Sequence, residues 1–291
     1  MSRSTDLLLT ALAPAIWGST YVVTTLLLPP GYPLTMALLR ALPAGLLLLL
    51  LVRQLPQGRW WGRVFLLGAL NFSLFWSLLF VAAYRLPGGV AATLGALQPL
   101  LVIGLARLSL GTPIHSLAIV GALAGMFGVA LLVLTPQATL DPLGIAAGLL
   151  SALSMALGVV LSRRWQPPTS TLTFTAWQLV AGGVLLIPLV LLLEPTPPSL
   201  SLPNLAGIAY LSLIGAAFTY LLWFRGIARL EPATVSSLGF LSPVSAVLLG
   251  WGLLQQSLSP LQLLGMLVVL GSVWLGQLAQ RATPQPVLQR S

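Results

Sequence analysis

Ten apolar segments, each about 20 residues long, follow one another along the chain, separated by short stretches that carry Arg, Pro-Pro or Pro-Gly. A helix rises about 1.5 Å per residue, so each segment is long enough to cross the hydrocarbon core of a bilayer. Backbone groups in lipid must be paired within their own segment, which favours helices, whereas a membrane barrel would show alternating stretches of about ten residues. We therefore predict an all-α integral membrane protein with ten transmembrane helices. The predicted spans are Leu7–Leu28, Leu34–Val52, Val64–Tyr84, Gly88–Ala106, Ser116–Leu134, Leu143–Ser162, Thr171–Leu193, Leu205–Phe224, Ala233–Leu254 and Leu261–Gln280.

The composition supports a lipid environment. Charged residues make up 6% of the chain and hydrophobic residues 57%, whereas about a quarter of the residues of a soluble domain are charged. So few charges cannot cover a water-soluble exterior. We therefore expect the lipid bilayer to be the partner that contacts most of the protein surface. The first segment is too long for the apolar core of a signal peptide and resembles the segments after it, so we expect it to be retained.

The basic residues predict the topology. All thirteen are arginines, against four acidic residues, and they are scattered singly or in pairs between apolar segments. Nucleic-acid binding needs basic residues clustered with aromatics on a solvated face, so we expect no nucleic-acid partner. With a cytoplasmic N-terminus, eleven arginines fall in inside connections, while Arg85 falls outside and Arg40 within the second span. This positive-inside pattern predicts a multi-pass protein of the bacterial inner (plasma) membrane with both termini in the cytoplasm.

The two halves of the chain resemble each other. Residues 85–99 and 229–243 match at six of fifteen positions without a gap, with Gly and Pro among the matches. The same offset of 144 residues aligns Trp76 with Tyr220, and an offset of 138 aligns Arg40 with Gln178. A repeat of five spans is odd-numbered, so the second copy must be inverted in the membrane. We predict a first repeat at 1–138, a second, inverted repeat at 139–282 and a cytoplasmic tail at 283–291, an arrangement typical of transporters.

Several motifs occur in the order and spacing of a known family. They are Trp17-Gly18-Ser19, Arg40, Ala83-Tyr84 before Pro87, Pro99 with Pro243, and Gly121 with Gly265. With these motifs the sequence resembles the drug/metabolite transporter (DMT) superfamily, specifically the EamA-type exporters of bacteria. The resemblance covers almost the whole chain and implies two inverted five-helix halves around a central cavity. It also implies export of amino acids, aromatic ones among them, or of related metabolites.

One departure from the family pattern concerns an acidic residue. The family commonly has a Glu before its fifth and tenth spans, and the matching positions here are Thr112 and Gln256. Any role of that carboxylate therefore does not carry over to this chain.

Paired prolines mark the predicted hinges. Pro99 and Pro243 remove a backbone donor within spans four and nine and free carbonyl groups in the preceding turn. Carbonyls freed at this depth need protein or water partners, so we predict that both prolines line a cavity wall that bends; a static packing kink is the alternative. Pro87, Gly88 and Gly89 form a further candidate hinge, because glycine accepts large dihedral changes, with an ordinary loop turn as the alternative.

Aromatic and small polar side chains within the spans predict a substrate site. Aromatic faces with a few amide and hydroxyl groups suit an amphipathic ligand of moderate size. The candidates are Trp17, Ser19, Tyr21, Asn71, Phe75, Trp76, Gln98, Ser154, Tyr220 and Ser242. The alternatives are an aromatic belt at the membrane interface and close helix packing through small residues.

Arg40 is the only charge well inside a predicted span. A charge within the membrane is costly, so attraction of a substrate carboxylate is one hypothesis for its role. Snorkelling to the outer interface, or hydrogen bonding to helix-terminal carbonyls, is the other.

The acidic residues are absent from the predicted spans. Asp6, Asp141, Glu194 and Glu231 lie at connections, and His115 lies near a cytoplasmic end. Proton-coupled carriers usually place a titratable group in the membrane, so we predict facilitated transport or exchange by alternating access. For the same reason we predict no enzyme activity, no metal site and no cofactor.

Two other transport functions stay open. A multidrug exporter driven by protons would need a membrane carboxylate. A flippase for lipid-linked substrates would need a cavity open to lipid with cationic groups, for which Arg40 is the one candidate. The oligomeric state is not predicted.

Overall fold

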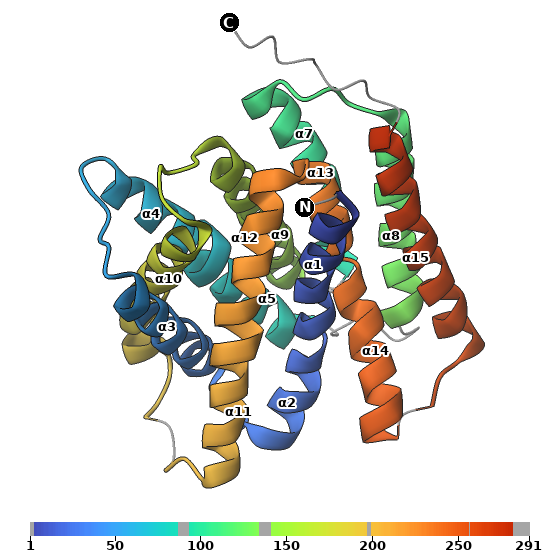
Figure 1. Ribbon diagram of the computed structural model, residues 1–291. Helices are drawn as coiled ribbons and strands as arrows, with labels where there is room; N and C mark the ends of the chain where they lie inside the picture. The colour runs from blue at the N-terminus through green and yellow to red at the C-terminus, as the bar shows by residue number, and fades with distance from the viewer. Residues whose placement is uncertain (1–2, 87–92, 134–140, 197–198, 256, 282–291) are drawn as a thin grey trace, which may run out of the picture.

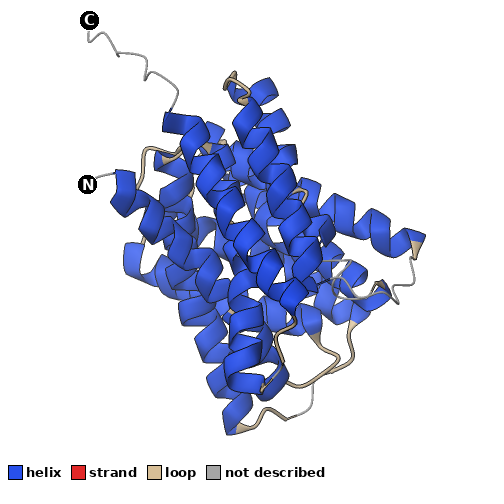
Figure 2. Cartoon of the chain, turned by 90° about the vertical axis from the view of Figure 1, so that its right-hand side faces the viewer, coloured by secondary structure: helices blue, strands red, loops and turns tan. Residues whose placement is uncertain are grey.

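The computed structural model describes residues 3–86, 93–133, 141–196, 199–255 and 257–281, and these residues form helices and connections without a strand (Figures 1 and 2). Ten helical stretches are long and apolar enough to cross a membrane, which confirms the predicted all-α architecture. Five of them are single helices. These are α3 (Pro33–Val52), α8 (Ser116–Val133), α9 (Pro142–Arg164), α10 (Thr171–Leu193) and α15 (Pro260–Arg281).

The other five spans are interrupted. The first and ninth are each divided into two helices, the third and eighth contain a π-helical turn, and the fourth is broken before its long helix. The elements are α1 (Arg3–Trp17) and α2 (Ser19–Leu27); α4 (Trp60–Gly68), η1 (Ala69–Ser73) and α5 (Leu74–Arg85); α7 (Gln98–Leu110); α11 (Leu202–Ser212), η2 (Leu213–Phe218) and α12 (Thr219–Arg229); and α13 (Pro232–Leu238) and α14 (Leu241–Leu254).

Helices from the two halves of the sequence pack against each other. The most extensive pairings join α8 with α15 and α3 with α10, and others join α5 with α9 and α1 with α12. In Figure 1, α8 and α15 stand side by side on the right, while α3 and α10 lie on the left. The two predicted repeats are therefore interleaved in space. Their predicted boundary at 138/139 and the predicted tail at 283–291 lie outside the described residues.

Irregular features recur at the offset seen in the sequence. The π-helices η1 and η2 begin 144 residues apart, at Ala69 and Leu213. The long helices of spans four and nine end in left-handed residues that are also 144 apart, Gly111 with φ 70° and Gln255 with φ 55°. Gln255 adopts a conformation that residues other than glycine rarely take. The repeated positions support the duplication inferred from the sequence.

Spans four and nine are broken just before the paired prolines. Turns occupy residues 96–97 and 239–240. Backbone hydrogen bonds there join residues that are three apart. For example, the N–H of Leu100 donates to the carbonyl oxygen of Leu97 at 3.0 Å. Pro99 and Pro243 therefore lie in the first turns of α7 and α14. Because a first-turn residue has no intrahelical partner for an N–H, neither proline removes a hydrogen bond from within α7 or α14.

Glycines bring α8 and α15 into close contact. A Cβ on Gly128 would lie 2.8 Å from Cγ2 of Val269, and one on Gly265 would lie 2.8 Å from the carbonyl oxygen of Gly128. Small residues at such positions let membrane helices approach until their backbones touch. The glycines of these two spans therefore pack one repeat against the other.

Candidate functional site

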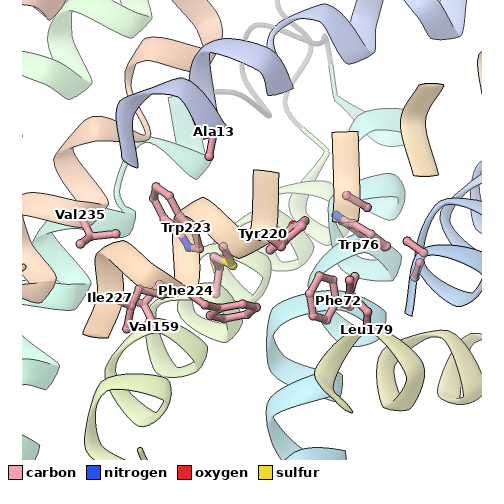
Figure 3. Close-up of a cluster of buried hydrophobic side chains, with 14 of the residues drawn as sticks. Ala13, Phe72, Trp76, Val159, Leu179, Tyr220, Trp223, Phe224, Ile227 and Val235 are labelled. Atoms are coloured by element: carbon pink, nitrogen blue, oxygen red, sulfur yellow. The ribbon is translucent and has the colours of Figure 1, made fainter. Parts of the chain in front are cut away.

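Aromatic side chains from three spans form a buried cluster in the middle of the molecule (Figure 3). Trp17 of α1 lies 5.0 Å, between ring centroids, from both Tyr220 and Trp223 of α12. Phe72 of η1 lies 4.6 Å from Tyr220 and 5.4 Å from Trp76 of α5. Tilted and edge-to-face rings at these distances attract one another, in addition to the contribution of burial. The predicted residues Trp17, Trp76 and Tyr220 are thus brought together, and Phe75 packs, half-buried, against the same core.

Polar contacts tie the first span to the eighth. Nε1 of Trp17 donates to Oγ1 of Thr219 at 2.9 Å. The hydroxyl of Ser19 lies 2.8 Å from that of Tyr210 and 2.7 Å from the carbonyl oxygen of Ile16, to which it donates. Trp17 and Ser19 therefore face span eight from either side of the break between α1 and α2. Tyr21, in contrast, is 64% exposed and does not join this group.

Arg40 points at the π-helix of span eight. Its Nη2 donates to the carbonyl oxygen of Gly215 at 2.6 Å, and its Cζ lies 5.4 Å from the ring centroid of Trp76. The same carbonyl accepts the hydroxyl of Thr219 at 2.8 Å. A π-turn disrupts the regular pairing of backbone groups, and here a guanidinium bonds one of its carbonyls. This carbonyl lies within span eight, so it is not a helix-terminal carbonyl of the kind that one hypothesis for Arg40 named. The Nε of Arg40 is buried and has no hydrogen-bond partner.

Asn71 belongs to a separate polar group around the other π-helix. Its Nδ2 donates to Oε1 of Gln178 at 2.8 Å and to Oγ of Ser162 at 3.2 Å. All three side chains are buried, and the backbone of Gly158 lies directly against the Asn71 amide. The sequence placed Asn71 and Trp76 on one helical face, but the structure directs them to different partners, because a π-turn rotates the face that follows it.

The two polar groups are related by the repeat. Arg40 corresponds to Gln178 at the offset of 138, and Asn71 corresponds to Gly215 at the offset of 144. In each case a polar side chain of span two or seven bonds the π-helix of a span in the other half of the chain, eight or three. We call these contacts the Arg40–Gly215 node and the Gln178–Asn71 node.

The serines predicted in span six bond the carbonyls of span three. Ser154 donates to the carbonyl oxygen of Leu70 at 2.9 Å, and Ser151 donates to that of Phe75 at 3.2 Å. Each serine therefore holds α9 against the π-helical region of span three. Both hydroxyls thus donate hydrogen bonds within the protein.

The polar residues beside the paired prolines lie where spans four and nine resume. Gln98 is the first residue of α7 and Ser242 the second of α14, and both are half-buried. A Cβ on Gly18 would lie 2.6 Å from the carbonyl oxygen of Ser242. The break in span one therefore packs directly against the break in span nine. The hinge predicted at Pro87, Gly88 and Gly89 lies outside the described residues.

Ion pairs hold two further helix contacts. Asp6 of α1 lies 2.5 Å from Arg225 and 3.5 Å from Arg229 of α12, measured between carboxylate and guanidinium atoms. Asp141, which caps α9, lies 3.4 Å from Arg85 of α5. The sequence had assigned Asp6, Arg225 and Arg229 to connections, but all three lie within helices. The first and eighth spans extend to Arg3 and Arg229.

Sequence reasoning assigned no role to Gln178 or Ser162, which complete the polar contacts around Asn71. Gln178 could have been found, since it is a buried amide at the position equivalent to Arg40. No group of three or more His, Cys, Asp or Glu residues that could hold a metal occurs in the described parts of the chain.

Known proteins share this arrangement. The EamA-like transporter family matches residues 5–134 and 142–276 separately, one match for each half. The chain is 48% identical to the protein PecM of Dickeya dadantii over 263 residues, covering 90% of this chain and 88% of PecM. It is 32% identical over 279 residues to the uncharacterized inner membrane transporter YedA of Escherichia coli K12, covering 94% of this chain and 91% of YedA. One solved crystal structure is 21% identical in sequence, and its alignment covers 97% of this chain and 100% of the chain in that structure. The TM-score of 0.84 shows that the two share a fold.

Proposed function

The chain belongs to the EamA-like transporter family, and from this premise we propose that it exports amino acids or related small metabolites by alternating access. It is a multi-pass membrane transporter and not an enzyme. Aromatic and hydrophobic amino acids are the favoured substrates within the proposal. The proposed location is the bacterial inner membrane with both termini in the cytoplasm, where eleven arginines would lie.

The aromatic cluster carries the substrate proposal. Trp17, Trp76 and Tyr220 come from three spans that are each interrupted by a break or a π-helix, and the ring of Trp76 lies 5.4 Å from Cζ of Arg40. Aromatic rings suit an apolar side chain, while a guanidinium with a free donor suits a carboxylate. Interrupted helices are the parts of a membrane protein where backbone groups become available to a substrate.

The repeated contacts support alternating access. The Arg40–Gly215 and Gln178–Asn71 nodes are equivalent under the inverted repeat, so exchanging the conformations of the halves exchanges the two nodes. The ion pairs Asp6–Arg229 and Asp141–Arg85 are related in the same way, because Arg85 and Arg229 are 144 residues apart. Two sets of matched contacts would then close opposite ends of the path in turn.

The charges favour facilitated transport or exchange over proton coupling. Asp6 is the one acidic residue within the spans described, and it lies in the first turn of span one, paired with arginines of span eight. This carboxylate is already bonded by two guanidinium groups within the protein. A multidrug exporter or a lipid-linked flippase is the alternative, and only Arg40 lies deep enough to serve a flippase phosphate.

Transport by purified protein in liposomes tests the proposal. We expect counterflow of labelled tryptophan, phenylalanine or leucine by the wild type, without a requirement for a pH gradient. Trp76→Ala and Gln98→Ala should lower the rate, whereas Trp274→Ala should not, because Trp274 is exposed on α15. Transport of none of these amino acids would refute the substrate class. Uptake driven by a pH gradient alone would refute the coupling.

Arg40→Gln tests how the substrate is held. Loss of a charge-assisted bond to a carboxylate should raise the KM for tryptophan about tenfold, which corresponds to roughly 1.4 kcal/mol. Tryptamine has the same ring system without the carboxylate, so its inhibition of tryptophan transport should be unaffected. An equal loss for both compounds would show that Arg40 acts only through its bond to Gly215.

A further inference from the structure

A polar hollow lies between two connections at one end of the molecule. It has a volume of about 710 Å³ and lies between the connection from α3 to α4 and the connection from α9 to α10. Six of the residues around it carry the argument: Arg53, Gln54, Gln57, Trp60, Thr169 and Trp177. Because helices end or begin on both sides, the hollow lies at the level where spans leave the membrane. We call it the loop hollow.

The walls of the loop hollow are fixed by hydrogen bonds. Nε1 of Trp177 donates to the carbonyl oxygen of Gln54 at 2.6 Å, and the hydroxyl of Thr173 donates to Oε1 of Gln54 at 3.3 Å. These bonds anchor the chain after α3 to the first turns of α10. Trp177 itself packs with Phe174 and Val64 in a small buried cluster. The hollow is therefore a preformed feature of the fold.

Unused donors surround the loop hollow. The guanidinium of Arg53 is exposed at its edge. The hydroxyl oxygen of Thr169 is buried and has no hydrogen-bond partner. The first turn of α10 borders the same place at Ser170 and Thr173, although the Ser170 side chain already accepts the N–H of Thr173. A cation, a free hydroxyl and a helix N-terminus together favour an anion with several oxygens, such as a phosphate. None of the four acidic residues borders the hollow.

The surface beside the loop hollow is apolar. Leu50, Leu51 and Leu55 expose 71%, 67% and 60% of their surfaces next to Arg53. Trp60 borders the hollow, and Trp61 beside it is 45% exposed, as expected for aromatics at a membrane interface. A ligand that fills this site would need an anionic head and a long apolar part. A membrane phospholipid has both.

We propose that the loop hollow binds the headgroup of an anionic phospholipid, with the phosphate at Arg53 and Thr169 and the acyl chains along Leu50, Leu51 and Leu55. Basic pockets between transmembrane helices are the general form of such sites at the cytoplasmic surface, where bacterial and other membranes carry negative charge. The bound lipid joins α3 and α4 to α10, which brings together helices of both repeats. The site is separate from the aromatic cluster and from the substrate path proposed above.

Titration of the purified full-length protein in mixed micelles tests the lipid site. Phosphatidylglycerol should raise the midpoint of thermal unfolding, followed by tryptophan fluorescence, by about 3 °C at saturation. Phosphatidylcholine, which has no net charge, should not do so. Glycerol 3-phosphate provides the same anion without acyl chains and should have no effect at matched concentration. Equal shifts with both lipids, or with glycerol 3-phosphate, would overturn the proposal.

Variants connect the effect to the hollow. Arg53→Gln should raise the half-saturating fraction of phosphatidylglycerol about fivefold, while Arg53→Lys should restore binding. Gln is chosen because Arg53 has a positive φ of 51°, and the replacement changes the charge without adding backbone strain. Thr169→Val should weaken binding independently. Arg164→Gln is the matched control, since Arg164 is an exposed arginine at the same end that does not border the hollow. If Arg53→Gln binds phosphatidylglycerol as well as Arg164→Gln does, the site is not the loop hollow.

Discussion

The two ends of the molecule use related ion pairs that differ in burial. At the arginine-rich end, the Asp6 side chain is 13% exposed and is bonded by Arg225 and Arg229. At the other end, the Asp141 side chain is 36% exposed and has Arg85, itself 47% exposed, at 3.4 Å. Arg85 and Arg229 occupy equivalent positions of the two repeats. The two arginines are about equally exposed, but Arg229 bonds a shielded carboxylate, whereas Arg85 bonds a solvated one.

The difference shows which ion pair this conformation holds more firmly. Exposed ion pairs contribute little, because water and salt screen them, whereas breaking a shielded pair leaves charges poorly solvated. The pair formed by Asp6 is therefore the more firmly held of the two ion pairs. In a carrier built from inverted repeats, equivalent contacts are expected to form and break in opposite phases, so the unequal pairs correspond to one state of the proposed cycle.

The largest effect is expected for Asp6→Asn. Removing this carboxylate takes the counter-charge from Arg225 and Arg229, which should lower the free energy of unfolding by about 2–3 kcal/mol, less than for a fully buried pair. It should also open the arginine-rich end. Because the chain contains no cysteine, a single Gln98→Cys reporter can be labelled with a membrane-impermeant maleimide from either side of oriented vesicles. Labelling from the arginine-rich side should rise.

Asp141→Asn in the same reporter background is the comparison for Asp6→Asn. It should change the stability much less, because its pair is solvated. If the two substitutions have equal effects on stability and labelling, the two ends are equivalent and the difference in burial has no functional meaning.

The second effect compares the two nodes. Gly158→Ala places a methyl group against the amide of Asn71, which is held by Gln178 and Ser162 and cannot move away. Such overpacking should cost about 2 kcal/mol and reduce transport. A Cβ on Gly215 would lie 3.6 Å from Nη2 of Arg40, an ordinary contact. Gly215→Ala should therefore be tolerated, and thermal unfolding of both variants measures the difference. Equal tolerance would mean that the Gln178–Asn71 node is not rigid.

The spans could be predicted because segment length and apolar content directly reflect the thickness of the bilayer. Their ends were less predictable. Arg225 and Arg229 have the character of loop residues in the sequence, yet they continue α12, because Asp6 from a distant span provides their counter-charge. Pro99 and Pro243 were predicted to bend spans four and nine, but a local pattern could not show that each span is broken just before its proline.

The candidate site was predictable in its residue types more than in its contacts. Aromatic residues in the spans predicted the cluster around Trp17, Trp76 and Tyr220, which the structure brings together. The π-helices leave no clear mark in the sequence, so neither the partner of Arg40 nor the role of Gln178 could be derived. Those contacts depend on how the repeats interleave, which is a long-range property of the fold.

A smaller effect is expected for Glu194→Gln. Glu194 follows α10 and accepts hydrogen bonds at the start of α3, from the N–H of Leu34 at 2.6 Å and of Thr35 at 2.7 Å. An anionic cap at a helix N-terminus contributes about 1 kcal/mol, and Gln retains only part of it. Thermal unfolding should show a drop of a few degrees with transport retained. Loss of transport without loss of stability would show that Glu194 lies in the substrate path and does not stabilise the contact between the end of α10 and the start of α3.

The smallest effect concerns Asp141 and pH. The N–H of Gly144, and to a lesser degree the charge of Arg85, lower the pKa of Asp141 below its ordinary value. A lowered pKa stabilises the folded state above the ordinary value, and the contribution is lost as the pH falls through the folded value. As the pH falls from about 5 through the ordinary value of 3.8 and then through the lowered folded value, the first turn of α9 should therefore lose protection from hydrogen exchange. The ratio of wild-type to Asp141→Asn exchange at each pH cancels the intrinsic rates and should fall to one at the acidic end. A ratio that is constant over this range would show that the Asp141 cap contributes nothing, and this end of the molecule would then be held by packing and by the bonds of Glu194 to the start of α3.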